Sequence, residues 1–264
     1  MSDMSKDVVA DLKRDHIAKL VAKGVRADGR KFDEMRPLKV ETNYIRSAEG
    51  SARVELGNTQ VVVGVKLIPG EPFPDTPNSG VLTTNAELIP MASDTFEAGP
   101  PDQESIEVAR VIDRGIREGH AVDMEKLVIE KAKEVWIMFV DVHVLDYDGN
   151  LFDAANIGAV AAFRTTVVPA KRAGKGEDFP LPVRHEPISL TSVKIGGKLL
   201  ADPTHDEERV AEARLTCATI ETGNLCAMQK GLAGSFTVDE VLKIVDMSRR
   251  IGSEVRAKLP TMGG

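Results

Sequence analysis

Three arginines share one side of a helix that the spacing of apolar residues predicts between residues 102 and 119. Arg110, Arg114 and Arg117 are four and three residues apart, so at about 100° per residue they fall in one arc of the helix surface. Such a row of guanidinium groups could bind anions. It could equally be a solvated face paired with carboxylates of the same helix, namely Glu107, Asp113 and Glu118. The spacing alone leaves both interpretations open, and the solvated face is the more common arrangement.

A second group of candidate side chains is acidic. It consists of Asp202, His205, Asp206, Glu207 and Glu208. Clustered carboxylates beside an imidazole could hold Mg²⁺ or Mn²⁺ over a phosphate. The spacing is loose, however, and a proline between Asp and Thr is typical of a turn whose carboxylates are solvated. The sequence favours the solvated turn.

The third candidate is the DYDGN segment at 146–150, because a turn between a strand and a helix can offer backbone N–H groups to a phosphate. A phosphate site normally adds a hydroxyl and an Arg or Lys side chain. The next residues are instead Leu151, Phe152 and Asp153, and an apolar pair followed by a carboxylate opposes anion binding.

The sequence holds no Ser-His-Asp order, HExxH, Walker loop or dinucleotide fingerprint. We expect His143, in an apolar strand, in the core or at an interface.

Composition limits the kind of protein. The 264 residues suit one large domain or two small ones, at roughly 100 to 200 residues per domain. No stretch of about 18 apolar residues occurs and the N-terminus is charged, so we expect a cytoplasmic protein with no membrane span. A net charge of −7 argues against coating nucleic acid with the whole surface, so any such site must be local. Cys217 and Cys226 are expected to be buried thiols.

The first half of the chain predicts a sheet and helices. A helix is expected at 5–24, two strands around a Gly57-Asn58 turn at 51–68, and a further strand at 80–90, which together predict an antiparallel sheet. After the arginine helix, the pattern predicts a short helix at 123–133, a mostly buried strand at 136–149 and an Ala-rich helix at 152–168.

The second half repeats this order of elements. Prolines and glycines at 169–187 indicate a linker. Two hairpins follow at 192–203 and 214–231, and a capping box at Thr237 begins a helix that runs to about Leu259. Both halves pass from hairpin strands to an amphipathic helix, which indicates a weak internal duplication.

Four segments resemble the RNase PH family of phosphate-dependent 3'-to-5' exoribonucleases, in that family's order. They are RADGRKFDEMRPL at 26–38, EGSARVELGNTQVVVGV at 49–65, ESIEVARVIDRGIRE at 104–118 and VLDYDGNLFDAANIGAVAAF at 144–163. The resemblance covers about residues 20 to 258. It implies an α+β, RNase PH-like fold of two similar β-hairpin/helix halves, of the ribosomal protein S5 domain 2-like type. We therefore predict an N-terminal helix (1–25), a first domain (26–168), a linker (169–187) and a second domain (188–259).

The resemblance also bears on activity. Active family members hold phosphate with a Gly-Gly-Ser/Thr-Arg turn, and the matching residues here are Gly149, Asn150, Leu151 and Phe152. Active members also carry paired arginines where this chain has Gln103 and Glu104. Their catalytic Asp lies in an acidic run that corresponds to 202–208 without a residue-by-residue match. The implication is a chain with no catalytic residue, metal or cofactor of its own.

Within the family, the chain resembles the non-catalytic subunit of the archaeal exosome ring. That resemblance implies a catalytic RNase PH-like partner in a hexamer of three heterodimers, RNA-binding cap proteins with S1/KH domains, and single-stranded RNA. It also implies that Arg110, Arg114 and Arg117 contact RNA at the boundary with the partner. Two alternatives stay open. One is an active phosphorolytic exoribonuclease using Asp202 or Asp206 with Mg²⁺, and the other is a ring scaffold without RNA contact, whose arginines form intersubunit ion pairs.

Overall fold

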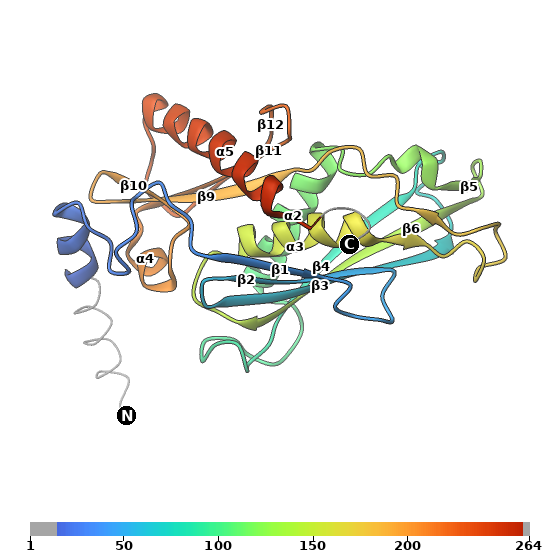
Figure 1. The fold of residues 1–264 in the computed structure, drawn as a ribbon, viewed down its shortest axis with the longest axis horizontal. Coiled ribbons are helices and arrows are strands. Elements are labelled where there is room, and N and C mark those ends of the chain that lie inside the picture. Colours follow the sequence, from blue (N-terminus) through green and yellow to red (C-terminus); the bar gives the residue numbers. More distant parts are fainter. Residues whose placement is uncertain (1–14, 261–264) are drawn as a thin grey trace.

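The computed structural model describes residues 15–260, which form two β-sheets with helices packed on and between them (Figure 1). The first sheet has the strand order β1-β2-β3-β6-β4, with β5 pairing to β6. Its strands are β1 (Leu38–Thr42), β2 (Gly50–Leu56), β3 (Thr59–Gly70), β4 (Val81–Leu88), β5 (Val128–Glu130) and β6 (Glu134–Asp146). The predicted hairpin with its turn at Gly57 and Asn58 is confirmed by the β2–β3 pairing.

Two predictions for this half are wrong. The sheet is not wholly antiparallel, because β4 runs parallel to β6. The chain reaches β6 from β4 by way of helix α2 (Gln103–Glu118), and a crossover of this kind returns the next strand in the same direction. The short helix expected at 123–133 is a single 3₁₀ turn, Met124–Leu127, followed by β5. The β-branched Val128 and Ile129 favour that strand.

Helix α3 (Leu151–Thr165) lies at the centre of the molecule and is buried from Leu151 to Phe163. It packs on β2 and β3 with one side and on the second sheet's β9 with another. Its small residues allow this close approach: a Cβ at Gly158 would lie 2.6 Å from Cγ2 of Val63. The predicted Ala-rich helix is confirmed, and its burial on all sides explains why it carries so few polar residues.

The second sheet is antiparallel, with the order β10-β9-β11-β12. Its elements are β9 (Ile188–Ile195), β10 (Lys198–Ala201), α4 (His205–Val210), β11 (Ala213–Thr219), β12 (Leu225–Gly231) and α5 (Val238–Lys258). Both predicted hairpins are confirmed. The capping box also forms, with Thr237 and Glu240 bonding reciprocally at the start of α5. Helix α5 packs on β9 and β11, so each sheet has a helix on one face.

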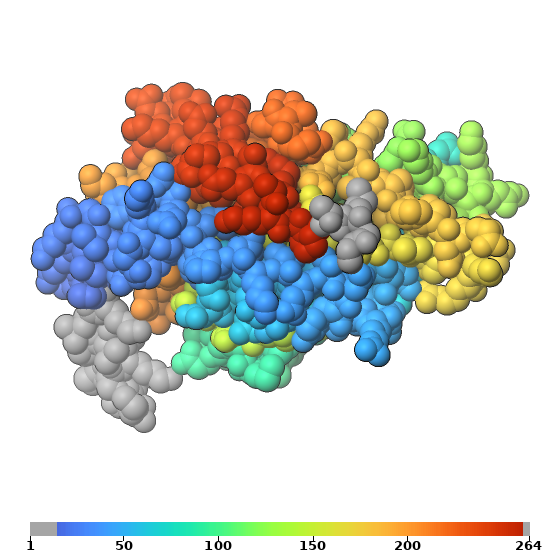
Figure 2. All heavy atoms as spheres, viewed as in Figure 1, coloured from blue at the N-terminus to red at the C-terminus, as the bar shows by residue number. Residues whose placement is uncertain are grey.

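The N-terminal segment packs against the second half, although it precedes the first. Of the helix predicted at 5–24, residues 5–14 lie outside the described residues, and 15–22 are helical. Ile17 and Val21 join a small apolar cluster with Val193, Ile195 and Leu200. Figure 2 shows the blue residues that follow this helix against the red α5, where Arg250 donates to the carbonyl oxygen of Asp33 at 2.9 Å.

The segment 169–187 connects the two halves along the surface of the first. It contains β8 (Phe179–Pro180), which pairs with β7 (Val167–Val168), and Val183 forms an isolated bridge with Val122. Both cysteines are free; Cys217 is buried and Cys226 is half-buried. Within 15–260, no helix is long and apolar enough to cross a membrane.

Candidate functional site

Helix α2 carries the arginine stripe on the side that faces away from its buried residues. Asp102 caps the helix by accepting from the Ser105 N–H at 2.8 Å, while Val108, Ile112 and Ile116 point into the core. The three arginines line a groove of about 560 Å³ between α2 and β4. They are therefore on one surface, as the spacing predicts.

The three arginines differ in their partners. Arg110 is exposed, and within the described part of the chain it forms no hydrogen bond or ion pair. Arg114 donates from Nη1 to Oε1 of Gln229 on β12 at 2.8 Å. Arg117 forms an ion pair with Asp113 at 3.0 Å. Of the carboxylates predicted to neutralise the stripe, only Asp113 does so.

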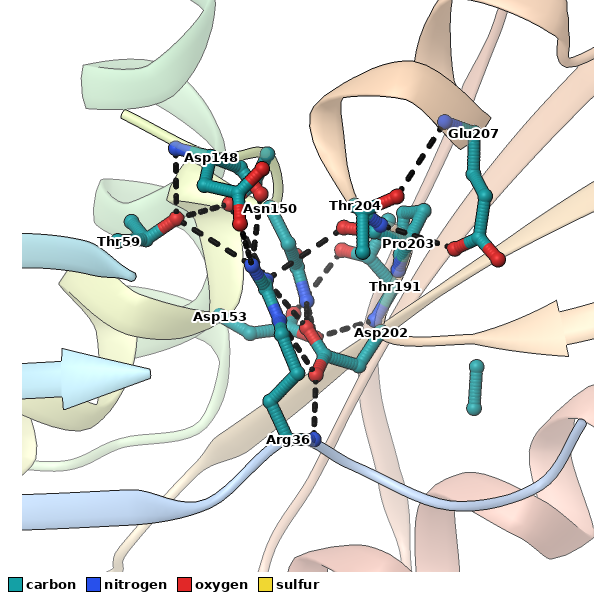
Figure 3. Close-up of polar contacts among 12 residues, drawn as sticks. Arg36, Thr59, Asp148, Asn150, Asp153, Thr191, Asp202, Pro203, Thr204 and Glu207 are labelled. Atoms are coloured by element: carbon teal, nitrogen blue, oxygen red, sulfur yellow. Dashed lines mark hydrogen bonds and ion pairs between the residues drawn. The ribbon is translucent and has the colours of Figure 1, made fainter. Parts of the chain in front are cut away.

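The turn before α3 is held by hydrogen bonds from the side chains around it (Figure 3). Gly149 has a φ of +87°, and a Cβ there would lie 2.5 Å from the backbone of Thr204 and of His205. Arg36 donates to the carbonyl oxygens of Asp148 at 2.6 Å and Gly149 at 3.2 Å. This turn packs so closely on the second half that only glycine fits at its tightest point.

Asp202 lies at the centre of this network and is fully buried. Its Oδ1 accepts from Arg36 Nη2 and from Asn150 Nδ2, each at 2.7 Å, and its Oδ2 accepts from Arg36 Nε at 3.0 Å. Arg30 also donates to Oδ2, at 3.1 Å. Burial by itself would raise the pKa of Asp202, but the hydrogen bonds and charge of Arg36 outweigh it and hold the pKa below its ordinary value.

The rest of the acidic group is also engaged within the chain. Glu207 pairs with the buried Arg26, whose Nε donates to Oε1 at 2.8 Å, and Thr204 caps α4. The prediction of a solvated turn is therefore wrong for Asp202 and Glu207, because arginines from residues 26–36 fold over them. In the described residues, no group of three or more His, Cys, Asp or Glu side chains is placed to hold a metal ion.

Glu208 occupies the place where the turn would offer an N–H group to an anion. The Asn150 N–H, at the N-terminus of α3, donates to Glu208 Oε1 at 3.0 Å, and the Tyr147 hydroxyl donates to Oε2 at 2.8 Å. Burial raises the pKa of Glu208 to about 7. The chain's own carboxylate thus satisfies the donor that a phosphate would need.

Beside Glu208 lies a cleft of about 380 Å³ between the two halves. The Arg214 guanidinium covers the Phe152 ring, 4.4 Å from its centroid, and pairs with Glu107 at 2.6 Å. Burial, and then the charge of Asp102, raises the pKa of Glu104 on the same wall. Arg209 is exposed at the cleft. The Arg214 guanidinium in this cleft is therefore already paired with a carboxylate.

Several residues of this site could not be identified from the sequence alone. Arg26 and Arg36 lie in the first resembling segment, but their partners are 181 and 166 residues away. Arg214 carries no local signal. His143, expected in the core or at an interface, is half exposed on β6 and lies 3.3 Å from the carboxylate of Glu87, because its side chain points away from the packed face of the sheet.

Comparison with known proteins identifies the family. The model of the 3' exoribonuclease family, domain 1, matches residues 34–169, and that of domain 2 matches residues 185–251. The chain belongs to the RNase PH family. The expected α+β, RNase PH-like fold is thereby confirmed.

The family members most informative here come from archaea. The chain is 54% identical over 256 residues to the exosome complex component Rrp42 of Methanocella arvoryzae, covering 97% of this chain and 98% of that protein. It is 54% identical over 254 residues to the Thermoplasma acidophilum Rrp42, covering 96% and 97%. These relatives place the chain close to one subunit type of the RNase PH family.

Solved RNase PH-like structures agree. A chain of the Archaeoglobus fulgidus exosome with RNA bound to the active site superimposes with a TM-score of 0.93 at 50% identity, covering 96% of this chain and all of that one. A chain of an archaeal exosome core gives 0.90 at 47% identity, covering 97% and 99%. Rice Rrp46, at 20% identity and a TM-score of 0.66, shares the fold.

We expect Asp202→Asn to lower the free energy of unfolding by about 3 to 5 kcal/mol, because it leaves the buried Arg36 without its counter-charge. Asp246→Asn, which breaks an exposed pair with Arg249 on α5, should change it by about 0 to 1 kcal/mol. Urea denaturation of the purified chains measures both. Equal losses in the two variants would contradict the prediction.

Glu208 should make stability depend on pH near neutrality. Its pKa of about 7 in the folded chain exceeds the ordinary value of 4.5, so between these values the folded chain binds a proton that the unfolded chain does not. The stability contributed by this group is complete below about pH 4.5 and is lost as the pH rises through about 7. The difference in unfolding free energy between the wild-type chain and Glu208→Gln should therefore fall from about pH 5 to about pH 8. A difference independent of pH would refute this assignment.

Proposed function

We propose that this chain is the non-catalytic RNase PH-like subunit of an exosome, a phosphorolytic 3'-to-5' RNA-degrading complex. In that role it structures the active site of a catalytic RNase PH-like partner and helps to hold the RNA. The observation that carries the proposal is the identity of about half of all residues, over nearly the full length, to archaeal proteins named as exosome component Rrp42.

The turn before α3, where Glu208 already accepts from the Asn150 N–H, supports the proposal that this chain has no catalytic activity of its own. Phosphorolysis brings an anionic nucleophile into line with another anionic group, and only positioned cations and donors can offset their repulsion. Here Leu151 and Phe152 stand where a hydroxyl and a guanidinium would be needed. Glu208 already binds the Asn150 N–H, and Arg214 is paired with Glu107. A phosphate entering this cleft would meet Glu104, Glu107 and Glu208 beside the exposed Arg209.

The contacts of Asp202 with Arg36 weigh against an active Mg²⁺-dependent enzyme. Asp202 is one of the two carboxylates, with Asp206, that this alternative could use, yet both oxygens of Asp202 accept hydrogen bonds from Arg36 and it has no exposed surface. Freeing this carboxylate would leave Arg36 buried and unpaired.

The groove along α2 supports RNA contact. Within residues 15–260, neither Arg110 nor Arg114 pairs with a carboxylate there, and guanidinium contacts to phosphates are independent of base sequence, as a degrader of many RNAs requires. In the scaffold alternative, these arginines would instead form ion pairs with a neighbouring subunit.

The proposed partners follow the subunit type. They are a catalytic sister in a ring of three heterodimers, and cap proteins with S1/KH domains that bind RNA. Unpaired sheet edges at β4 and β12, with Leu225 and Met228 partly exposed on the latter, fit assembly into a closed ring. Two free cysteines suit a reducing compartment, so we propose the cytoplasm.

The purified chain should not shorten a 3'-tailed RNA in phosphate and Mg²⁺, because its own cleft cannot hold the nucleophile. Addition of the catalytic RNase PH-like partner should produce nucleoside diphosphates and a particle whose mass by light scattering corresponds to a hexamer. Phosphate-dependent release of nucleoside diphosphates by the isolated chain would contradict the proposal that this subunit is non-catalytic.

Replacing Arg110, Arg114 and Arg117 together by Ala should weaken RNA binding by the assembled ring. For each arginine that neutralises a phosphate, the log-log salt slope for single-stranded RNA should fall by about 0.7. Fluorescence anisotropy over a salt series measures the slope, and light scattering checks the ring. An intact ring with unchanged affinity and slope rejects RNA contact, whereas loss of the ring favours the scaffold alternative.

A further inference from the structure

We propose that Asp113 attenuates RNA binding by competing with RNA phosphate for Arg117. This inference rests on the proposed function, because it concerns how the α2 groove holds RNA. It adds a residue of opposite charge to the interface and assigns unequal roles to the three arginines.

The Asp113 carboxylate is placed to occupy the Arg117 guanidinium. Arg117 donates from Nε to Oδ2 and from Nη2 to Oδ1 of Asp113, both at 3.0 Å, so two donors meet two acceptors. This is the geometry in which a guanidinium would also bind two phosphate oxygens. A carboxylate and a phosphate therefore compete for the same edge of Arg117.

The opposite wall of the groove holds this pair in place. From β4, the Thr84 hydroxyl donates to Asp113 Oδ1 at 3.3 Å, and the Leu82 carbonyl oxygen accepts from Arg117 Nη2 at 3.3 Å. Both partners of the ion pair are thus fixed from a strand as well as from their own helix. The pairing is part of the groove and not an incidental contact on the outer helix surface.

The other two arginines lack such a competitor. Arg114 bonds to the neutral amide of Gln229, and Arg110 forms no hydrogen bond or ion pair with any residue from 15 to 260. Arg117 remains reachable, since its side chain is 51% exposed and that of Asp113 27%. Exposed pairs are weak enough for a phosphate to displace the carboxylate. RNA therefore meets two arginines that have no carboxylate partner within residues 15–260 and one that must first exchange its partner.

This arrangement suits an RNA that moves stepwise through the groove. A chain shortened by one nucleotide at a time must release each phosphate before it advances, and every fully formed phosphate contact opposes that movement. A carboxylate that takes over the guanidinium when the phosphate leaves makes the release less costly. Asp113 thereby lowers the affinity of the groove for RNA and eases the movement of the RNA along it.

The test compares two charge-neutralising variants in the ring assembled with the catalytic partner. Asp113→Asn removes the counter-charge of Arg117 and one of its two acceptors. Asp246→Asn frees Arg249 on α5, which contributes no residue to the groove; Arg249 likewise pairs with a carboxylate on its own helix, at 3.2 Å, and donates to a carbonyl oxygen, that of Gly223. The pair is thus a matched control for the loss of one negative charge.

Anisotropy titrations with a single-stranded RNA over a salt series give the readout. Asp113→Asn should tighten binding at low salt by roughly two- to fivefold, the range that an exposed ion pair spans. Its log-log salt slope should steepen by about 0.7, because one more phosphate displaces its counterions. Asp246→Asn should alter neither quantity.

Two outcomes would overturn the inference. Behaviour of Asp113→Asn identical to that of Asp246→Asn would show that no competition exists, and weaker binding would show that Asp113 positions Arg117 for the phosphate instead. The triple arginine variant separates this inference from the proposed function. If that variant loses affinity while Asp113→Asn has no effect, only the attenuation fails; if the triple variant binds normally, RNA contact itself fails.

Discussion

The rest of the structure depends on the buried ion pair between Arg36 and Asp202, because this pair joins three distant segments of the chain. It ties the segment before β1 to the end of β10, and through Asp148 and Gly149 it ties both to the turn before α3. A buried arginine is tolerated only where its donors are satisfied, and here carbonyl and carboxylate oxygens from distant segments accept them. The relative position of the two halves is therefore set by charge as well as by apolar packing.

That junction also decides what the cleft can bind. Once Asp202 is held beside the turn, α4 begins at His205 directly against Gly149, and Glu208 on its next turn reaches the Asn150 N–H. A helix N-terminus that would attract an anion is thus supplied with an internal one. The turn before α3 is therefore a structural joint in this chain, held by Arg36 and by the bond between the Asn150 N–H and Glu208.

Helix α2 packs in the first half, and its charged residues also contact the second half. Its Arg114 bonds to Gln229 on β12, its Glu107 pairs with Arg214 on β11, and its apolar face packs in the first half. The orientation of the groove is consequently set by both sheets. Buried charges in this protein hold the halves together, whereas Arg110 and Arg117 of α2 are exposed to solvent.

The sequence by itself determined the elements whose signals are local. Apolar spacing predicted α2, the capping box at Thr237 predicted α5, and β-branched runs around glycine turns predicted the hairpins. The absence of a hydroxyl and a guanidinium at Leu151 and Phe152 is likewise legible in the residue types. The resemblance of four segments added the fold and the family, which no periodicity could supply.

Only the tertiary structure decided which charges meet. Asp202 reads as a solvated turn residue, yet Arg36 lies 166 positions earlier and buries it. The strand β4 was predicted, but its parallel pairing with β6 was not, since β6 follows only after a crossover helix. Asp113 was one of three carboxylates near the stripe, and only the fold shows that it alone pairs with an arginine of that stripe. Local patterns report neighbours within a few residues, whereas burial and ion pairing depend on segments that chain folding brings together.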